Sequence, residues 1–264
     1  MLIYIIRHGE TEANREGYLQ GWRDEPLNES GRALAVITGQ RMRDIRFDAC
    51  ISSPLCRARE TAEIILREQG RKVKEKEEIL RCAQDDTDCA QDDKKGGRDD
   101  TCDDPAEIVI ETDERIKEIH MGEWEHKRIR GGECEVDPEQ MKYFFNNPFA
   151  FPGFPGGENA RQVMERTQAF LKELLARDDG KTYLVATHGF ALRAMLNCLY
   201  EDPSDFWHGR VPYNCAVNVI EGKNGQGKLI AEDRIYYDPE QVVDRYEAIQ
   251  NFRKFEIDPS LRSG

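Results

Sequence analysis

Two short apolar runs in this chain each end in the dipeptide His-Gly. The first, residues 3–6, leads through Arg7 to His8, and the second, residues 182–187, leads to His188. Such runs of apolar and β-branched residues, closed by a glycine, are typical of buried strands that end in a turn. A single histidine after a strand is usually an ordinary loop residue. Because the pattern occurs twice, we expect the two histidines to lie together at one edge of a sheet.

The rest of the chain alternates between segments with strand character and segments with helix character. We predict further strands at 47–52, 107–110, 215–220 and 229–236. We predict helices at 30–44, 57–69, 158–177, 190–199 and 240–253. This alternation predicts an α/β fold, a three-layer αβα sandwich whose sheet is mostly parallel with helices on both faces. In such sheets ligands bind beyond the carboxyl ends of the strands.

Composition and charge limit the partners of the protein. Its 264 residues carry a net charge of −13, which argues against nucleic acid or an anionic membrane as a partner. No apolar run approaches the roughly 20 residues that a membrane span needs, and no basic segment of a signal peptide precedes the first strand. The eight cysteines include no C-x-x-C pair and match no familiar zinc pattern. We therefore expect a cytoplasmic protein without a metal, in which a local cationic site attracts any anionic substrate.

We interpret residues 1–264 as a single domain with two additions. The segment at about 81–104 contains nine aspartates and repeats Asp-Asp every seven residues, so we predict a disordered acidic insertion. Cation binding by its carboxylates and cysteines is the alternative, although the segment lacks the glycine and glutamate placement of a calcium loop. A helical extension is predicted from about residue 239. Residues 143–157, rich in Phe, Pro and Gly, are predicted to form an irregular loop over the site.

Charged residues follow the predicted strands. Arg7 comes directly after the first strand, and Arg57 lies near the start of a predicted helix, where free N–H groups favour anions. Two histidines, two arginines and a carboxylate suit a phosphoryl group, which carries about −1.5 to −2 charge near neutral pH. Three carboxylates beside a tryptophan and a glycine turn are candidates for the proton donor, and the residues alone leave the choice open: Glu118, Glu123 and Glu125.

The order and spacing of four motifs resemble the histidine phosphatase superfamily, also called the phosphoglycerate-mutase-like family. The motifs are Arg7-His8-Gly9-Glu10-Thr11 with Asn14, Ser52-Ser53-Pro54-Leu55-Cys56-Arg57-Ala58-Arg59-Glu60-Thr61-Ala62, Glu118 through Trp124, and Thr187-His188-Gly189. The resemblance covers roughly residues 1–80 and 107–237. The segment Gly122-Glu123-Trp124-Glu125 is most similar to the broad-specificity and alpha-ribazole phosphatase branch.

This resemblance implies a role for each matching residue. His8 would be the nucleophile that becomes phosphohistidine, and Arg7, Arg57 and His188 would hold the phosphoryl oxygens. Glu118, by its place before the glycine turn, would be the proton donor in preference to the other two glutamates. Further substrate contacts would come from Gly9, Thr11, Asn14, Gln20, Gly21 and Gly189. The resemblance implies neither a cofactor nor a metal.

We therefore expect a phosphomonoesterase that acts on a small phosphorylated metabolite. A cofactor-dependent phosphoglycerate mutase is the alternative, although the longer mutase-type loop after residue 125 is not recognisable. A non-catalytic module that binds phosphorylated ligands is a third possibility, and the complete motif argues against it. The basic cluster at 126–130 could bind a second anionic group of the substrate, or it could be a solvated loop that balances the acidic insertion. An exposed edge strand could support a homodimer.

Overall fold

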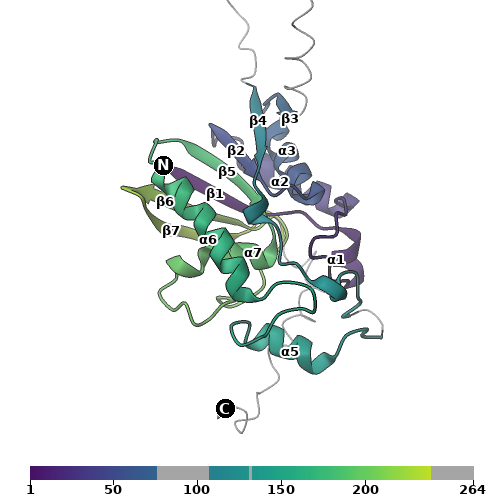
Figure 1. The fold of residues 1–264 in the computed structure, drawn as a ribbon. Helices are drawn as coiled ribbons and strands as arrows, with labels where there is room; N and C mark the ends of the chain where they lie inside the picture. Colours follow the sequence, from purple (N-terminus) through teal and green to yellow (C-terminus); the bar gives the residue numbers. More distant parts are fainter. Residues whose placement is uncertain (76–106, 131–132, 239–264) are drawn as a thin grey trace, which may run out of the picture.

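The computed structural model describes residues 1–75, 107–130 and 133–238. The predicted acidic insertion at 81–104 and the helical extension from 239 lie outside these residues, so both stay predictions. The described part forms a sheet with helices packed on it and a smaller layer of loops and one helix at one end (Figure 1).

Seven strands form one sheet in the order β3-β4-β2-β5-β1-β6-β7. Their bounds are β1 (Leu2–Arg7), β2 (Ala49–Ser52), β3 (Val73–Glu75), β4 (Ile108–Thr112), β5 (Thr182–Thr187), β6 (Val217–Lys223) and β7 (Gln226–Arg234). The pairs from β3 across to β1 are parallel, and the last two strands join as antiparallel edge strands. The predicted α/β fold with a mostly parallel sheet is confirmed.

The helices agree with the predicted segments in position. Their bounds are α1 (Glu12–Glu16), α2 (Glu29–Arg41), α3 (Cys56–Glu68), α5 (Pro138–Asn146), α6 (Ala160–Ala176) and α7 (Gly189–Leu196), with 3₁₀ turns η1 (Glu114–Ile116), η2 (Gly122–Trp124) and η3 (Asn197–Leu199). The short helices α1 and α5 were not predicted. In the described ranges, no helix has both the length and the apolar character that crossing a bilayer requires.

Alternation along the strands gives each face of the sheet its own apolar core. On β1, Ile3 and Ile5 pack with α6 and α7, whereas Ile6 packs with α2 and α3. All three side chains are fully buried. Because successive strand residues point to opposite faces, a run that is apolar at every position is the pattern of a strand covered on both sides.

A third apolar cluster joins α5 to the loops around it and to the start of α7. The prediction of an irregular loop over 143–157 was wrong for its first residues, because α5 extends to Asn146. Asp137 caps this helix by accepting from the N–H of Glu139, and Met141, Phe144 and Phe145 are buried at the spacing of one helical face. The aromatic residues of this region thus belong partly to a helix that packs over the end of the sheet.

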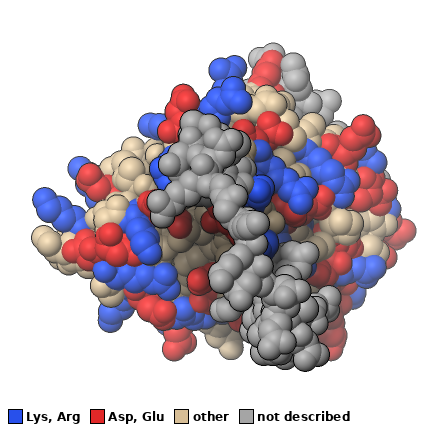
Figure 2. Space-filling model, turned by 90° about the horizontal axis from the view of Figure 1, so that it is seen from above, with Lys and Arg blue, Asp and Glu red and all other residues tan. Residues whose placement is uncertain are grey.

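Acidic and basic side chains are mixed on the face of the molecule that Figure 2 shows, without separating into large fields of one sign. An anionic ligand would therefore be attracted by a local group of cations and not by the overall field of the protein, whose net charge is negative.

Candidate active site

His8 follows β1 directly and is buried. Its Nδ1 lies 2.6 Å from the carbonyl oxygen of Gly9. Because a carbonyl oxygen can only accept, Nδ1 must carry a proton, and the neutral ring then has its lone pair on Nε2. Burial, followed by the positive charges of Arg57 and Arg7, holds the pKa of His8 well below its usual value of 6.5. At neutral pH the ring is therefore neutral, and its Nε2 can act as a nucleophile.

Two arginines lie beside this histidine. Arg57, in the first turn of α3, is fully buried and donates to the carbonyl oxygens of Gly21 and Arg23, both at 2.8 Å. Its Nε has no hydrogen-bond partner in the part of the chain that the structure describes. Arg7, the last residue of β1, donates to the carbonyl of Pro212. Burial lowers the pKa of Arg57, yet a guanidinium stays charged at neutral pH, so this site attracts anions.

His188 reaches the same place from β5. Strands β1 and β5 are parallel neighbours in which Arg7 pairs with Thr187, so the residues that follow them, His8 and His188, emerge side by side. The centroids of the two rings are 5.1 Å apart. His188 is fully buried, and its Nε2 lies 2.7 Å from Oγ of Ser53. Burial and the neighbouring cationic side chains hold the pKa of His188 well below its usual value.

Among the three carboxylates that the residues alone left open, Glu118 lines the cavity beside His8. Its carboxylate accepts from the N–H groups of Ala191 at 3.0 Å and Phe190 at 3.2 Å, which are in the first turn of α7. The carboxylate of Glu125 is bound elsewhere, because it accepts from loop backbone N–H groups. Glu123 is exposed. The geometry thus places Glu118 at the site, as the resemblance implied.

The polar loop after His8 is organised by the small helix α1. Thr11 and Asn14 form a capping box, in which the N–H of Asn14 donates to Thr11 Oγ1 at 3.1 Å and the N–H of Thr11 to Asn14 Oδ1 at 3.3 Å. The amide of Gln20 also donates to Thr11. Thr11 therefore holds two residues of the cavity wall in place but does not line the cavity itself.

Gly9 and Gly189, which follow the two histidines, lie in different surroundings. A Cβ on Gly9 would lie 2.6 Å from the carbonyl oxygen of Gly31, closer than any real contact allows. The N–H of Gly9 donates to Thr61 Oγ1 at 2.9 Å, so it is bound within the protein. Gly189 lines the cavity, and a Cβ there would lie 3.3 Å from Arg7 Nε. Close approach of neighbouring groups is what requires a glycine at position 9.

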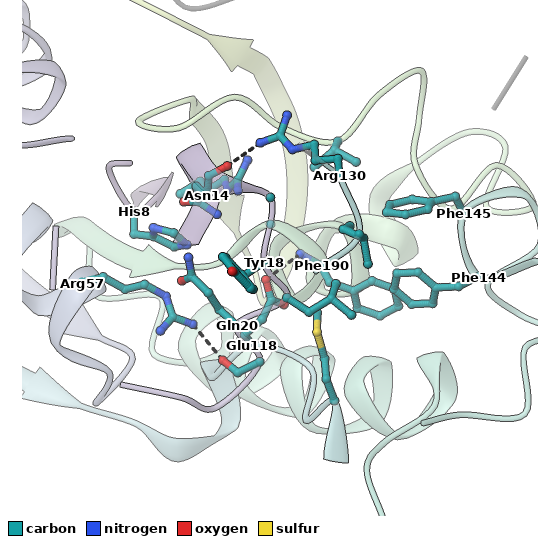
Figure 3. A pocket seen from close by; sticks show the side chains of 18 of the residues that line it. His8, Asn14, Tyr18, Gln20, Arg57, Glu118, Arg130, Phe144, Phe145 and Phe190 are labelled. Atoms are coloured by element: carbon teal, nitrogen blue, oxygen red, sulfur yellow. Dashed lines mark hydrogen bonds between the residues drawn. The ribbon is translucent and has the colours of Figure 1, made fainter. Parts of the chain in front are cut away.

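These residues border a cavity of about 120 Å³. The predicted site residues in its wall are Arg7, His8, Asn14, Gln20, Gly21, Arg57, Glu118 and Gly189. Gly9, Thr11 and His188 lie outside the wall. The apolar part of the wall consists of Leu19, Met121, Ile129, Phe144, Phe145, Phe190, Trp207 and Val211. Figure 3 shows His8 and Arg57 at one end of the cavity and Phe144 and Phe145 at the other.

Asn214 supports the histidine loop, although no sequence pattern predicted this. Its buried Nδ2 donates to the carbonyl oxygens of His8 and Gly9, both at 3.0 Å. Ser53 and Thr61, which hydrogen-bond to His188 and to the Gly9 backbone, were also not predicted to contribute. Both lie in the motif that contains Arg57. Asn214 belongs to no motif, and its only signal is a polar residue just before an apolar strand.

The loop that contains Asn214 and Trp207 is tied to Arg193 on α7. The Arg193 guanidinium is fully buried and donates to the carbonyl of Arg210 at 2.9 Å and to Glu232 at 2.8 Å. It also donates to Tyr200 and Asp233. This cation therefore links α7 and β7 to the loop that forms one wall of the cavity.

The basic cluster at 126–130 packs against the segment that follows His8. The ring of His126 stacks on Tyr18 with centroids 4.7 Å apart, and the guanidinium of Arg128 lies 4.6 Å from the same ring. Arg130 donates to the carbonyl of Asn14 and lines the cavity (Figure 3). Arg130 therefore does not fit the interpretation of this cluster as a solvated loop.

A mostly parallel α/β sheet, with two buried neutral histidines and two arginines beyond the ends of its strands, is the arrangement of proteins that handle phosphoryl groups through histidine. Comparison with known families agrees. The sequence model of the histidine phosphatase superfamily (branch 1) matches residues 3–81 and 100–232, and this chain belongs to that superfamily.

Individual relatives include both mutases and phosphatases by name. The chain is 27% identical over 224 residues to the "Probable phosphoglycerate mutase GpmB" of Salmonella choleraesuis, which covers 85% of this chain and 86% of the relative. It is similar in structure to Bacillus stearothermophilus YhfR, with a TM-score of 0.66, 29% identity, and coverage of 89% and 97% of the two chains. A mycobacterial glucosyl-3-phosphoglycerate phosphatase shares the fold, with a TM-score of 0.63, 18% identity, and coverage of 88% and 98%.

Proposed function

We propose that this protein is a phosphomonoesterase that hydrolyses small phosphorylated metabolites through a phosphohistidine on His8. The observation that carries the proposal is the protonation state of His8 and the position of its ring. Its Nδ1 is fixed on the Gly9 carbonyl at 2.6 Å, and burial beside Arg7 and Arg57 keeps the ring neutral, so Nε2 is a nucleophile next to two cations. This is the combination that an attack on a phosphate dianion requires.

The reaction would proceed in two displacements. Nε2 of His8 attacks phosphorus, and the ester oxygen leaves with a proton from Glu118. A water molecule, deprotonated by Glu118, then attacks the phosphohistidine and releases inorganic phosphate. Arg7 and Arg57 neutralise the phosphoryl oxygens in both steps, which is the main demand of phosphoryl transfer. General acid catalysis of this type contributes about 10²–10⁴-fold. No metal and no cofactor enter the scheme.

The wall beyond the arginines supports hydrolysis over mutase activity. A mutase must hold a sugar acid with a carboxylate and a second phosphate while it transfers the first. Within the described residues, Arg130 is the one cationic side chain of the wall besides Arg7 and Arg57, and eight wall residues are apolar. We therefore propose a substrate whose leaving group carries an apolar, ring-like part against Phe145 and Trp207.

Phosphoglycerate mutase remains the second candidate, because a relative that shares 27% identity is named as one. Arg130 is the residue that such an activity would need for a second anionic group. A non-catalytic binding module is the third candidate, which the complete set of site residues disfavours. The cytoplasmic location and a homodimer are also proposed, from composition and from the edge strand.

The test is phosphate release from a pair of esters with the same kind of primary alcohol as leaving group, 2-phenylethyl phosphate and glycerol 3-phosphate, with chelator present. We expect a higher kcat/KM for the phenylethyl ester, by about tenfold to a hundredfold, since a buried aromatic ring contributes roughly 1.5–3 kcal/mol. His8→Ala should abolish release and the acid-labile phosphoenzyme. Conversion of 3-phosphoglycerate with 2,3-bisphosphoglycerate, without release of phosphate, would instead make the protein a mutase. Binding of esters without turnover would make it a binding module.

A further inference from the structure

Ser53 is the one side chain that hydrogen-bonds to the second histidine of the site in the described part of the structure. Both residues are fully buried. The distance from Ser53 Oγ to His188 Nε2 is 2.7 Å, and Ser53 Oγ also accepts from the N–H of Leu55 at 3.3 Å. The backbone of Ser53 is fixed as well, because its N–H donates to the carbonyl of Ala186 at 2.9 Å. The Ser53 hydroxyl therefore has two hydrogen-bond neighbours, His188 Nε2 and the N–H of Leu55, and the second of these is a donor.

This geometry determines where the serine proton goes. The N–H of Leu55 occupies a lone pair of Ser53 Oγ, so the hydroxyl proton needs an acceptor. Within the described residues, His188 Nε2 is the one group in reach that can accept it. If Nε2 carried the proton instead, it would donate to the second lone pair of Ser53 Oγ, and the buried serine hydroxyl proton would be left without an acceptor, which is unfavourable. The neutral imidazole must then have its proton on Nδ1.

The other nitrogen of the ring bears on what this N–H donor would bind. His188 Nδ1 is buried and has no hydrogen-bond partner among the described residues. With the proton on Nδ1, this atom is an N–H donor that lacks an acceptor. The ring centroid lies 5.1 Å from that of His8, so a phosphoryl group on His8 lies within reach of His188. Its oxygens would supply the missing acceptor.

We infer that Ser53 is a positioning residue that fixes His188 as the Nδ1–H tautomer and thereby presents a neutral N–H donor to the phosphoryl group. The inference about the donor's target rests on the proposed function, whereas the tautomer follows from the hydrogen bonds alone. In this scheme Ser53 touches no substrate atom and acts only through His188. The proton on Nδ1 stays on the ring throughout the reaction.

The test reads the tautomer directly, by long-range ¹H–¹⁵N correlation spectra of the histidine rings in the full-length protein at pH 7. In the wild type, His188 should show a protonated Nδ1 and an unprotonated Nε2. Ser53→Ala should give a mixture of tautomers or the Nε2–H form, and Ser53→Thr, which keeps the hydroxyl, should restore the wild-type spectrum. A protonated Nε2 in the wild type, or an unchanged spectrum in Ser53→Ala, would overturn the inference. Addition of inorganic phosphate should shift the Nδ1–H resonance of the wild type, and no shift would refute the proposed target.

Kinetics give the second readout. With the ester that is turned over best, Ser53→Ala should lower kcat by about tenfold to a hundredfold with a smaller change in KM, and Ser53→Thr should recover most of it. Ser52→Ala is the matched control, because Ser52 is equally buried and its hydroxyl donates to the Ser53 carbonyl at 2.9 Å and not to a histidine. Equal losses in the two alanine variants would contradict the tautomer role. If the wild type releases no phosphate from any ester, the proposed function fails, while the spectra still decide the role of Ser53.

Discussion

Acid should destabilise the folded protein through its two buried histidines. His8 and His188 have pKa values well below the usual 6.5, because burial penalises their charged forms and cationic groups lie nearby. The unfolded chain therefore binds more protons than the folded chain once the pH falls below about 6.5, and folding stability must decrease in that range. Well above pH 6.5, near pH 7.5 and higher, both states hold the rings almost entirely neutral, so no stability is lost to these rings there.

The size of this loss of stability follows from the protonation of the unfolded chain. Between pH 7.5 and 5.5 an unfolded histidine of pKa 6.5 gains almost a full proton, and a buried ring that stays neutral gains none. Each ring then loses up to about 1.4 kcal/mol of stability over this interval, or roughly 2.7 kcal/mol for the pair. That is a substantial part of the ~5–15 kcal/mol by which a typical domain is stable.

The assay is urea unfolding followed by tryptophan fluorescence at pH 7.5 and 5.5, for the wild type and for the double variant His8→Gln/His188→Gln. The variant should lose less stability than the wild type on acidification, by roughly 2.7 kcal/mol. The carboxylates and the other histidines, His120, His126 and His208, are common to both proteins, so their contributions cancel in the comparison. Equal losses in the two proteins would show that these rings take up protons in the folded state, and the argument for a neutral nucleophile would then fail.

Two further substitutions test the supports of the site. Arg193→Ala should lower the free energy of unfolding by about 3–5 kcal/mol in urea titrations, because it leaves the carboxylates of Glu232 and Asp233 without their buried cation. An exposed ion pair contributes only about 1 kcal/mol or less, so a change of that size would contradict the role assigned to burial. Asn214→Ala should reduce the kcat of phosphate release by about tenfold to a hundredfold, because it removes the amide donor that holds the carbonyls of His8 and Gly9. An unchanged kcat would show that the His8 loop keeps its shape without Asn214.

The sequence alone determined most elements of the fold and four of the side chains that gather at the site. Apolar runs with β-branched residues identified every strand except the three-residue β3, and helical patterns identified α2, α3, α6 and α7, because both signals depend on residues close together in the chain. The charged residues at strand ends, Arg7, His8, Arg57 and His188, were predicted to gather because parallel strands present their carboxyl ends at one edge. The structure brings these four together. What local patterns encode was therefore predictable.

Only the tertiary structure decided which side chains complete the site. Glu118 and Glu125 have similar neighbours in the sequence, and packing against the first turn of α7 is what sets Glu118 beside the cavity. Asn214 contacts the carbonyl of His8 although 206 residues separate them. The aromatic side chains Phe144 and Phe145 of the cavity wall likewise depend on α5, whose first residues carried no prediction and whose last residues fall in the predicted loop. Such contacts depend on strand order, register and the fit of side chains across the core, and these are properties of the whole packed chain that no local pattern specifies.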